Sequence, residues 1–188
     1  MENTNVMKKL LLLALIVFTF FNANASHIMG GEITWECIKD PSNPDVGKYI
    51  FKMKIYRDCD GISLSLLSQT IEVWNGGATP FTTITVDFVS NTDISPVCDV
   101  LNSGNPALNC ATNPVGAVEE YIYVSNPISL VGVPPVGGWH FTWDSCCRNG
   151  ATTNLLNPAS VGFTLRASMY PYFPGGFPNP AIASSPCF

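Results

Sequence analysis

The residues of this chain best suited to chemistry are its seven cysteines. A cysteine can serve as a nucleophile or a zinc ligand only as its thiolate. The chain has no Cys-x-x-Cys pair, and its N-terminus resembles an export signal, which indicates an oxidising compartment. We therefore predict structural disulfides with no metal or cofactor, formed by the six cysteines in the body of the chain: Cys37, Cys59, Cys98, Cys110, Cys146 and Cys147.

The pairing of these six cysteines is open, because six thiols allow fifteen connectivities. Adjacent cysteines rarely bridge each other, so we expect Cys146 and Cys147 to reach two different partners. The preferred arrangement is Cys98 with Cys110, and Cys37 and Cys59 with the adjacent pair in either order. Cys187 is then the odd cysteine.

Carboxylates suggest two further kinds of chemistry. Asp58 and Asp60, followed by a glycine, resemble the start of a calcium loop but lack the later glutamate, so a turn is preferred and calcium is a minor alternative. Glu119 or Glu120 could pair with Asp144 as in a glycosidase, although such coincidences are common in an acidic chain. We predict no catalytic residues and no enzymatic activity.

Histidines and arginines add little to a catalytic hypothesis. His27 could bind copper only at a terminus of the Ala-Ser-His type, and His140 is expected on the solvent side of a strand. No Gly-x-Ser-x-Gly nucleophile motif is present. Arg57 and Arg148 each neighbour a cysteine, and we expect an ion pair with Asp58 or with Asp144.

Exposed aromatic rings could stack on sugars, and Trp74, Trp139 and Trp143 are the candidates. The competing interpretation is a packed core, because Trp139 and Trp143 share one strand face with Phe141. We prefer the core for that face and keep ligand stacking as the alternative.

The elements that must position these residues are short strands. Apolar residues alternate with polar ones in 48–56, where Tyr49, Phe51, Met53 and Ile55 share a face. Further strands are expected within 33–37, 64–74, 81–89, 119–124, 139–143 and 161–169. About seven strands separated by turn residues predict an all-β, disulfide-stapled, Ig-like or jelly-roll-like β-sandwich.

The ends of the chain divide it into three parts. Residues 1–25 have the charged, apolar and small-residue regions of a signal peptide, residues 26–169 form the predicted sandwich, and 170–188 form a Pro/Gly-rich tail that looks truncated. The apolar run of the signal is too short for a membrane helix, and no later stretch is long enough. A net charge of −5 without a basic cluster argues against nucleic-acid binding.

Three segments occur in an informative order: Ser26-His-Ile-Met-Gly-Gly-Glu-Ile-Thr-Trp-Glu-Cys37, Lys54-Ile-Tyr-Arg-Asp-Cys59 and Ser145-Cys-Cys-Arg-Asn149. Together they resemble the N-terminal module of Bacteroidetes gliding-motility-associated, adhesin-like surface proteins. Such proteins continue into PKD, Ig-like or cadherin-like repeats and end in a type IX secretion sorting domain.

The resemblance covers residues 26–169 and implies a non-catalytic module in surface adhesion or gliding motility. Its expected partners are cell-surface proteins or glycans and, if the chain is a fragment, downstream repeats of the same protein. The expected location is the extracellular side or outer cell surface, or the periplasm if the chain is complete. A secreted carbohydrate-binding module that uses exposed tryptophans is the alternative.

Overall fold

The structure, a computed structural model, describes residues 27–64, 66–97, 104, 106–146, 148, 152–173 and 187. The predicted signal peptide lies outside these residues. Within them, seven strands and one 3-10 turn follow one another: β1 (Ile28–Cys37), β2 (Tyr49–Asp58), β3 (Gln69–Trp74), β4 (Thr82–Asp93), β5 (Val118–Val124), β6 (Trp139–Ser145), η1 (Pro158–Ser160) and β7 (Phe163–Met169).

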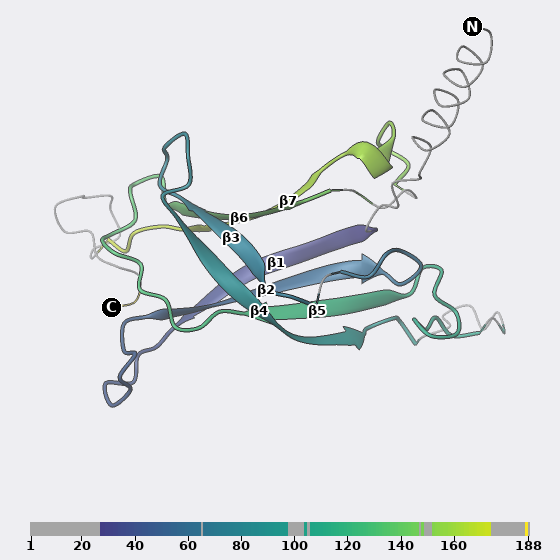
Figure 1. The fold of residues 1–188 in the computed structure, drawn as a ribbon, viewed down its shortest axis with the longest axis horizontal. Coiled ribbons are helices and arrows are strands. Elements are labelled where there is room, and N and C mark those ends of the chain that lie inside the picture. The colour runs from purple at the N-terminus through teal and green to yellow at the C-terminus, as the bar shows by residue number, and fades with distance from the viewer. Residues whose placement is uncertain are drawn as a thin grey trace, which may run out of the picture.

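The strands pair antiparallel in the order β1-β2-β5-β4-β3-β6-β7. Strand β4 belongs to both layers, because residues 82–86 pair with β3 and residues 87–93 pair with β5. In Figure 1 the layer with β6 and β7 therefore lies over the layer with β1, β2 and β5, and β4 crosses between them. The predicted all-β, disulfide-stapled sandwich of about seven strands is confirmed.

Alternation of apolar and polar residues decides which face each strand buries. In β2, Phe51, Met53 and Ile55 are fully buried, whereas Lys52 and Lys54 between them point outward. Strands β3 and β6 follow the same rule, with alternate residues buried. The strands expected from sequence are thus present, and their apolar faces meet between the two layers.

Aromatic rings join the layers at the centre of the core. Phe51 of β2 and Phe141 of β6 have ring centroids 4.8 Å apart, and Trp35 of β1 lies 5.4 Å from Phe141. Tilted rings at such distances add favourable contacts beyond the burial of apolar area. Because these rings come from opposite layers, they hold the sandwich together through its middle.

Strands β1 and β7 stand at the two ends of the strand order and lie against each other. A Cβ atom on Gly31 would be 2.5 Å from the Lys54 carbonyl oxygen and 2.7 Å from Leu165 Cδ1. At the N-terminal end of β1, Ile28 forms a parallel bridge with Arg148. The sheet is therefore nearly closed, and a glycine makes the close approach of β1 to β7 sterically feasible.

The C-terminal end of β4 differs from the prediction. We expected this strand within 81–89, whereas β4 continues to Asp93. A register shift between Phe88 and Ser90 lets the strand stay paired with β5 past this point. The pairing with β5 keeps these polar residues in the sheet.

Candidate functional site

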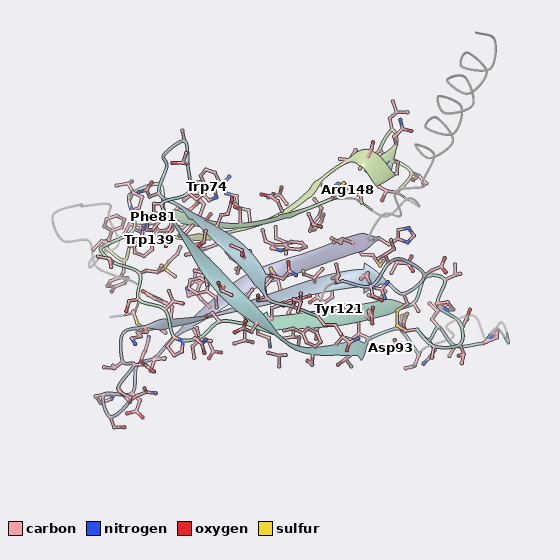
Figure 2. All side chains as sticks on the ribbon, in the orientation of Figure 1. Trp74, Phe81, Asp93, Tyr121, Trp139 and Arg148 are labelled. Carbon is pink, nitrogen blue, oxygen red and sulfur yellow. A yellow bond between two sulfur atoms is a disulfide. The ribbon has the colours of Figure 1, made fainter. Side chains whose placement is uncertain are left out.

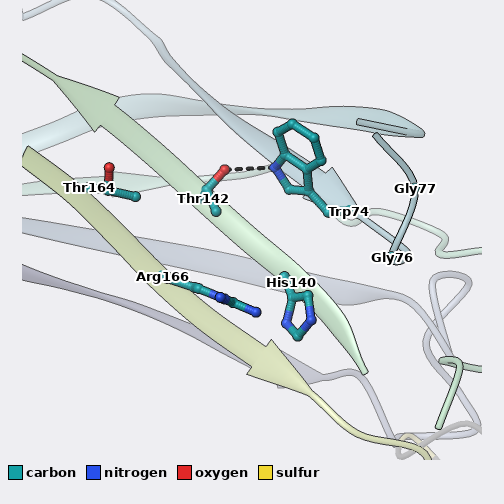
Figure 3. A pocket seen from close by; sticks show the side chains of 7 residues that line it. All are labelled: Trp74, Gly76, Gly77, His140, Thr142, Thr164 and Arg166. Carbon is teal, nitrogen blue, oxygen red and sulfur yellow. Dashed lines mark hydrogen bonds between the residues drawn. The ribbon is translucent and has the colours of Figure 1, made fainter. Parts of the chain in front are cut away.

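A groove of about 330 Å³ lies on the outer face of the layer formed by β3, β6 and β7. Figure 3 shows its side chains on neighbouring strands, with the β3–β4 turn at one end. Its lining residues are Trp74, Gly76, Gly77, His140, Thr142, Thr164 and Arg166.

Strand register brings these residues to one surface. Because Val73 and Phe141 are buried in the core, their neighbours Trp74, His140 and Thr142 must face outward. Trp74 pairs with His140, and Thr142 pairs with Arg166 of β7. Residues directly opposite each other on antiparallel strands have close side chains, so the groove crosses three strands.

The Trp74 indole is held in a defined orientation. Its Nε1 donates a hydrogen bond to Thr142 Oγ1 at 2.8 Å, and Figure 3 shows the ring next to that strand. The side chain is half-buried. A fixed, partly exposed indole offers an aromatic surface with little rotamer entropy left to lose on binding.

His140 and Arg166 supply the polar part of the groove. His140 Nδ1 and Ser168 Oγ are hydrogen-bonded at 2.8 Å. Burial, and secondly the positive charge of Arg166, lower the pKa of His140 below its ordinary value of 6.5. The imidazole is therefore neutral at pH 7, and the exposed Arg166 guanidinium is the positively charged group of the groove.

The β3–β4 turn at the end of the groove contains two glycines, Gly76 and Gly77. Gly76 has φ +94, a conformation that other residues rarely adopt, and a Cβ there would meet nothing within 4 Å. Asn75 Oδ1 accepts a hydrogen bond from the Gly77 amide at 3.3 Å and closes the turn locally. The turn therefore lines the groove with backbone and leaves its space unfilled.

The three candidate tryptophans lie in different environments. Trp139 and Trp143 are only 3% and 6% exposed and belong to the core, as preferred from their shared face. They are therefore unavailable for ligand stacking, which corrects that alternative for these two residues. Trp74 is the candidate that lies in a groove, and its role as a stacking residue remains a prediction.

The pairing expected for the cysteines is wrong. Cys59 bonds to Cys110, with Cα atoms 5.1 Å apart, and Cys37 bonds to Cys187, with Cα atoms 5.5 Å apart. Cys187 is therefore not the odd cysteine. Cys146 is disulfide-bonded as well. Cys98 and Cys147 lie outside the described residues.

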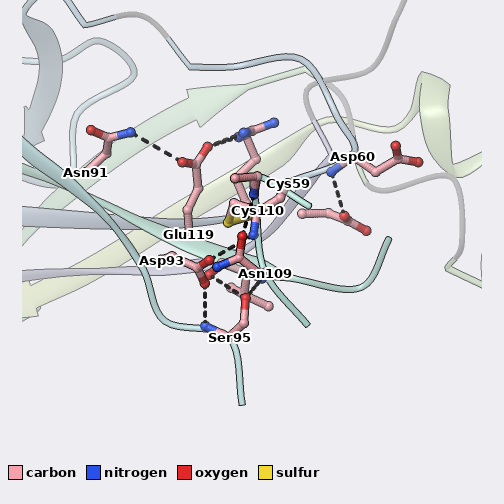
Figure 4. The surroundings of a disulfide bond; sticks show 12 residues. Cys59, Asp60, Asn91, Asp93, Ser95, Asn109, Cys110 and Glu119 are labelled. Atoms are coloured by element: carbon pink, nitrogen blue, oxygen red, sulfur yellow. Dashed lines mark hydrogen bonds and ion pairs between the residues drawn. A yellow bond between two sulfur atoms is a disulfide. The ribbon is translucent and has the colours of Figure 1, made fainter. Parts of the chain in front are cut away.

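The physical reason for the Cys59–Cys110 bond is the pairing of β2 with β5. Cys59 follows β2, and its amide donates to the Ala117 carbonyl just before β5 at 3.0 Å. The Cys110 amide donates to Asp93 Oδ2 at 2.8 Å, which fixes the loop against the end of β4 (Figure 4). Cys110 bonds to Cys59 because the fold brings these two residues together, whereas the prediction paired Cys110 with Cys98 because they are close in sequence.

A buried polar cluster lies beside this disulfide. Arg57 pairs with Glu119, and not with Asp58 or Asp144 as predicted. Glu119 Oε1 also accepts a hydrogen bond from the Tyr121 hydroxyl at 2.9 Å. Figure 4 shows the contacts on Glu119. The ion pair thus forms across β2 and β5, where Arg57 and Glu119 are directly opposite in register.

Arg148 has a different environment. Its guanidinium carbon lies 5.2 Å from the Phe163 ring centroid, and its Nε donates to the Gly162 carbonyl at 3.2 Å. Figure 2 places Arg148 at the end of the molecule where β7 begins. It therefore joins the segment after β6 to the start of β7, instead of pairing with Asp144.

The carboxylates proposed for catalysis do not meet. Glu119 is buried in its ion pair, and Glu120 lies on the outer face of its layer, 3.0 Å from Lys54 Nζ. Asp144 lies on β6 in the other layer and accepts a hydrogen bond from Thr164. The structure therefore does not assemble a pair of acid and base from these residues.

The segment considered as a possible start of a calcium loop is a turn at the end of β2. Asp58 Oδ1 accepts a hydrogen bond from the Asp60 amide at 3.0 Å, and the Gly61 amide donates to the Asp58 carbonyl at 3.1 Å. No group of three or more His, Cys, Asp or Glu side chains among the described residues could hold a metal ion. The turn preferred from sequence is present.

The three segments behind the family resemblance meet at one end of the sandwich. The His27 carbonyl accepts from the Asp58 amide at 3.1 Å, and a Cβ on Gly61 would be 2.5 Å from His27 Cβ. Ile28 bridges to Arg148. These segments thus form structural contacts where the sheet closes, and none of their residues is among those that line the groove.

Most of the groove has no recognisable signal in the amino-acid sequence. Thr142, Thr164 and Arg166 are ordinary polar residues at outward positions of strands, and nothing in their spacing marks a site. Knowledge of the β6–β7 register would have placed Arg166 opposite Thr142. Outward residues on adjacent strands can be grouped into one site only when the strand pairing is known, and the sequence alone does not reveal that pairing.

Among the described residues, the structure has no helix with the length and apolar character needed to cross a lipid bilayer. No protein-family model, curated protein or solved structure matches the chain.

Proposed function

We propose that this chain is a non-catalytic, exported surface module that forms the N-terminal cap of an adhesin-like protein and acts in cell-surface adhesion or gliding motility. The observation that supports it best is the meeting of the three family-like segments where the sheet closes. Because these segments make the contacts that close the sheet, chains that contain all three should contain the same kind of domain. Two described disulfides, suited to an oxidising environment, support export.

Surface labelling of intact producing cells tests this proposal. An antibody against the folded domain should stain cells without permeabilisation, and protease treatment of intact cells should remove the signal. Beads coated with the oxidised domain should adhere to the surface that the cells colonise, whereas beads coated with reduced and alkylated domain should not. Staining only after the outer membrane is opened would contradict surface display.

A second candidate function is carbohydrate binding, and the Trp74 groove favours it. The face of an indole carries partial negative charge and attracts the C–H groups of a sugar ring. Hydroxyl, imidazole and guanidinium groups beside the ring can hydrogen-bond to sugar hydroxyls. The groove combines one oriented aromatic ring with several polar side chains, which is the composition that sugar recognition needs.

Tryptophan fluorescence titrated with a panel of neutral and acidic polysaccharides tests the second candidate. We expect the emission to change on binding and the Trp74→Ala variant to lose most of its affinity. Tyr172→Ala removes an aromatic ring that is 54% exposed and lies outside the groove, so it serves as the matched control. Absence of binding across the panel, or equal loss in both variants, would contradict this function.

A further inference from the structure

We propose that the groove selects an acidic carbohydrate, with a uronic-acid ring stacked on Trp74 and its carboxylate bound by Arg166. This inference rests on the carbohydrate-binding function proposed above and names its ligand class. It requires a suitable spacing between the indole and the guanidinium, free donor groups on Arg166, and a charge pattern that tolerates a carboxylate there.

The spacing follows from the register of three strands. Trp74 of β3 is opposite His140 of β6, and Arg166 of β7 is opposite Thr142, two residues farther along β6. Neighbouring strands are about 4.8 Å apart, so β7 lies roughly 10 Å from β3. The hydrogen bond to Thr142 draws the indole toward β6 and shortens this interval. One sugar ring with an attached carboxylate can therefore extend from the indole to the guanidinium (Figure 3).

Arg166 has donors available for a ligand. It is exposed, and the ion pairs formed among the described residues involve Lys48, Lys54 and Arg57 instead. Its neighbour His140 has a lowered pKa and does not add a second positive charge at pH 7. A guanidinium presents a planar fork of N–H groups that matches the two oxygens of a carboxylate.

Flanking acidic side chains restrict where a negative charge can bind. Asp144 is opposite Thr164, from which it accepts a hydrogen bond, and Glu72 is opposite Thr142 on the side away from Arg166. A second negative group next to either carboxylate would be repelled. The groove should therefore prefer glycans whose carboxylates are separated by neutral sugars, and should disfavour densely sulfated polymers.

Binding of matched oligosaccharides to the oxidised chain tests the inference. The probes are hyaluronan oligosaccharides, in which glucuronate alternates with a neutral sugar, alginate and pectin oligosaccharides, the methyl ester of each, and dextran sulfate. Methyl esterification removes the charge and preserves the ring. We expect at least one acidic probe to bind about 10-fold to 100-fold more tightly than its ester, because a hydrogen bond to a charged group is being lost.

Two variants separate the guanidinium from overall charge. Arg166→Gln should bind the acidic probe and its ester equally, whereas Lys52→Gln, which makes the same charge change on the outer face of the other layer, should keep the preference. Thermal melting and circular dichroism verify that both variants are folded. The preference should also shrink as ionic strength rises from about 0.01 M to about 1 M.

The outcomes distinguish the two proposals. Equal binding of acids and esters, or an acid preference that survives Arg166→Gln, would overturn the acidic-ligand inference and leave carbohydrate binding in place. Tighter binding of dextran sulfate than of every uronic oligosaccharide would also overturn it, in favour of a general anion site. If neither neutral nor acidic glycans bind, both the inference and the carbohydrate-binding function fail.

Discussion

Arg57 and Glu119 form an ion pair inside the sandwich, with only 4% and 7% of the two residues exposed. Arg57 Nε donates to Glu119 Oε1 at 2.7 Å, and Asn91 Nδ2 donates to Glu119 Oε2 at 3.3 Å. Tyr121 lies on the same carboxylate, and the Arg57 guanidinium carbon is 6.0 Å from its ring centroid. Each charged group loses its hydration on burial, and the interaction with the other group offsets that loss.

Removal of one member of this pair should destabilise the protein strongly. We expect Arg57→Met to lower the free energy of unfolding by about 3–5 kcal/mol, because Glu119 would remain buried without its partner. Urea denaturation measures the loss. Lys48→Met is the control, since Lys48 and Asp45 form an exposed pair at 2.6 Å and such pairs contribute about 0–1 kcal/mol. Similar losses in the two variants would contradict the importance assigned to burial.

A methyl group on Gly31 should disturb the contact between β1 and β7. We expect Gly31→Ala to lower the free energy of unfolding by about 1–3 kcal/mol, because its Cβ would collide with the Lys54 carbonyl and Leu165. Thermal or urea unfolding measures this change. Gly30→Ala is a close control, since its Cβ would meet only Tyr56 Cδ2, at 3.8 Å. A loss as large at Gly30 as at Gly31 would disprove the steric explanation.

Peptide mapping should recover the two described disulfides. A digest under non-reducing conditions should contain peptides linked through Cys37–Cys187 and Cys59–Cys110. Replacing either pair by serine should cost about 2–5 kcal/mol of stability, and the bond with the larger separation should cost more because it constrains a longer loop of the unfolded chain. The separations are 150 and 51 residues. A peptide linked through Cys98–Cys110 would contradict the assignment.

Alkaline pH should weaken the fold through its buried tyrosines. Burial, with a smaller effect of Tyr121, raises the pKa of Tyr123 to about 12, whereas an unfolded tyrosine ionises near 10. Between these values the unfolded chain has lost a proton that the folded chain keeps, so stability falls as pH rises. Stability from Tyr123 is complete below about pH 10 and is lost up to about pH 12.

Denaturation at a series of pH values, with tyrosinate absorbance in parallel, measures this decline. Tyr123→Phe should make the dependence on pH shallower, and Tyr172→Phe, at a tyrosine that is 54% exposed, should leave it unchanged. A dependence that is the same in the wild type and in Tyr123→Phe would assign the decline to other groups.

The strands and the core could be predicted from sequence because both depend on local alternation. Phe51, Met53 and Ile55 alternate with lysines, so their burial can be predicted without knowing which strand pairs with β2. The partners of Arg57 and Cys59 could not be predicted, because both depend on the pairing of β2 with β5, which are more than 50 residues apart in sequence. The groove depends in the same way on the pairing of β3, β6 and β7.

The Cys37–Cys187 bond has a mechanical consequence for the folded chain. A tensile load applied between the N-terminal end of β1 and Cys187 is carried through β1 and then across this covalent bridge. Residues 38–186 lie outside the load path, so stretching can detach β1 but cannot extend the enclosed strands. The strands that carry the groove, β3, β6 and β7, therefore receive no pull along their own backbone.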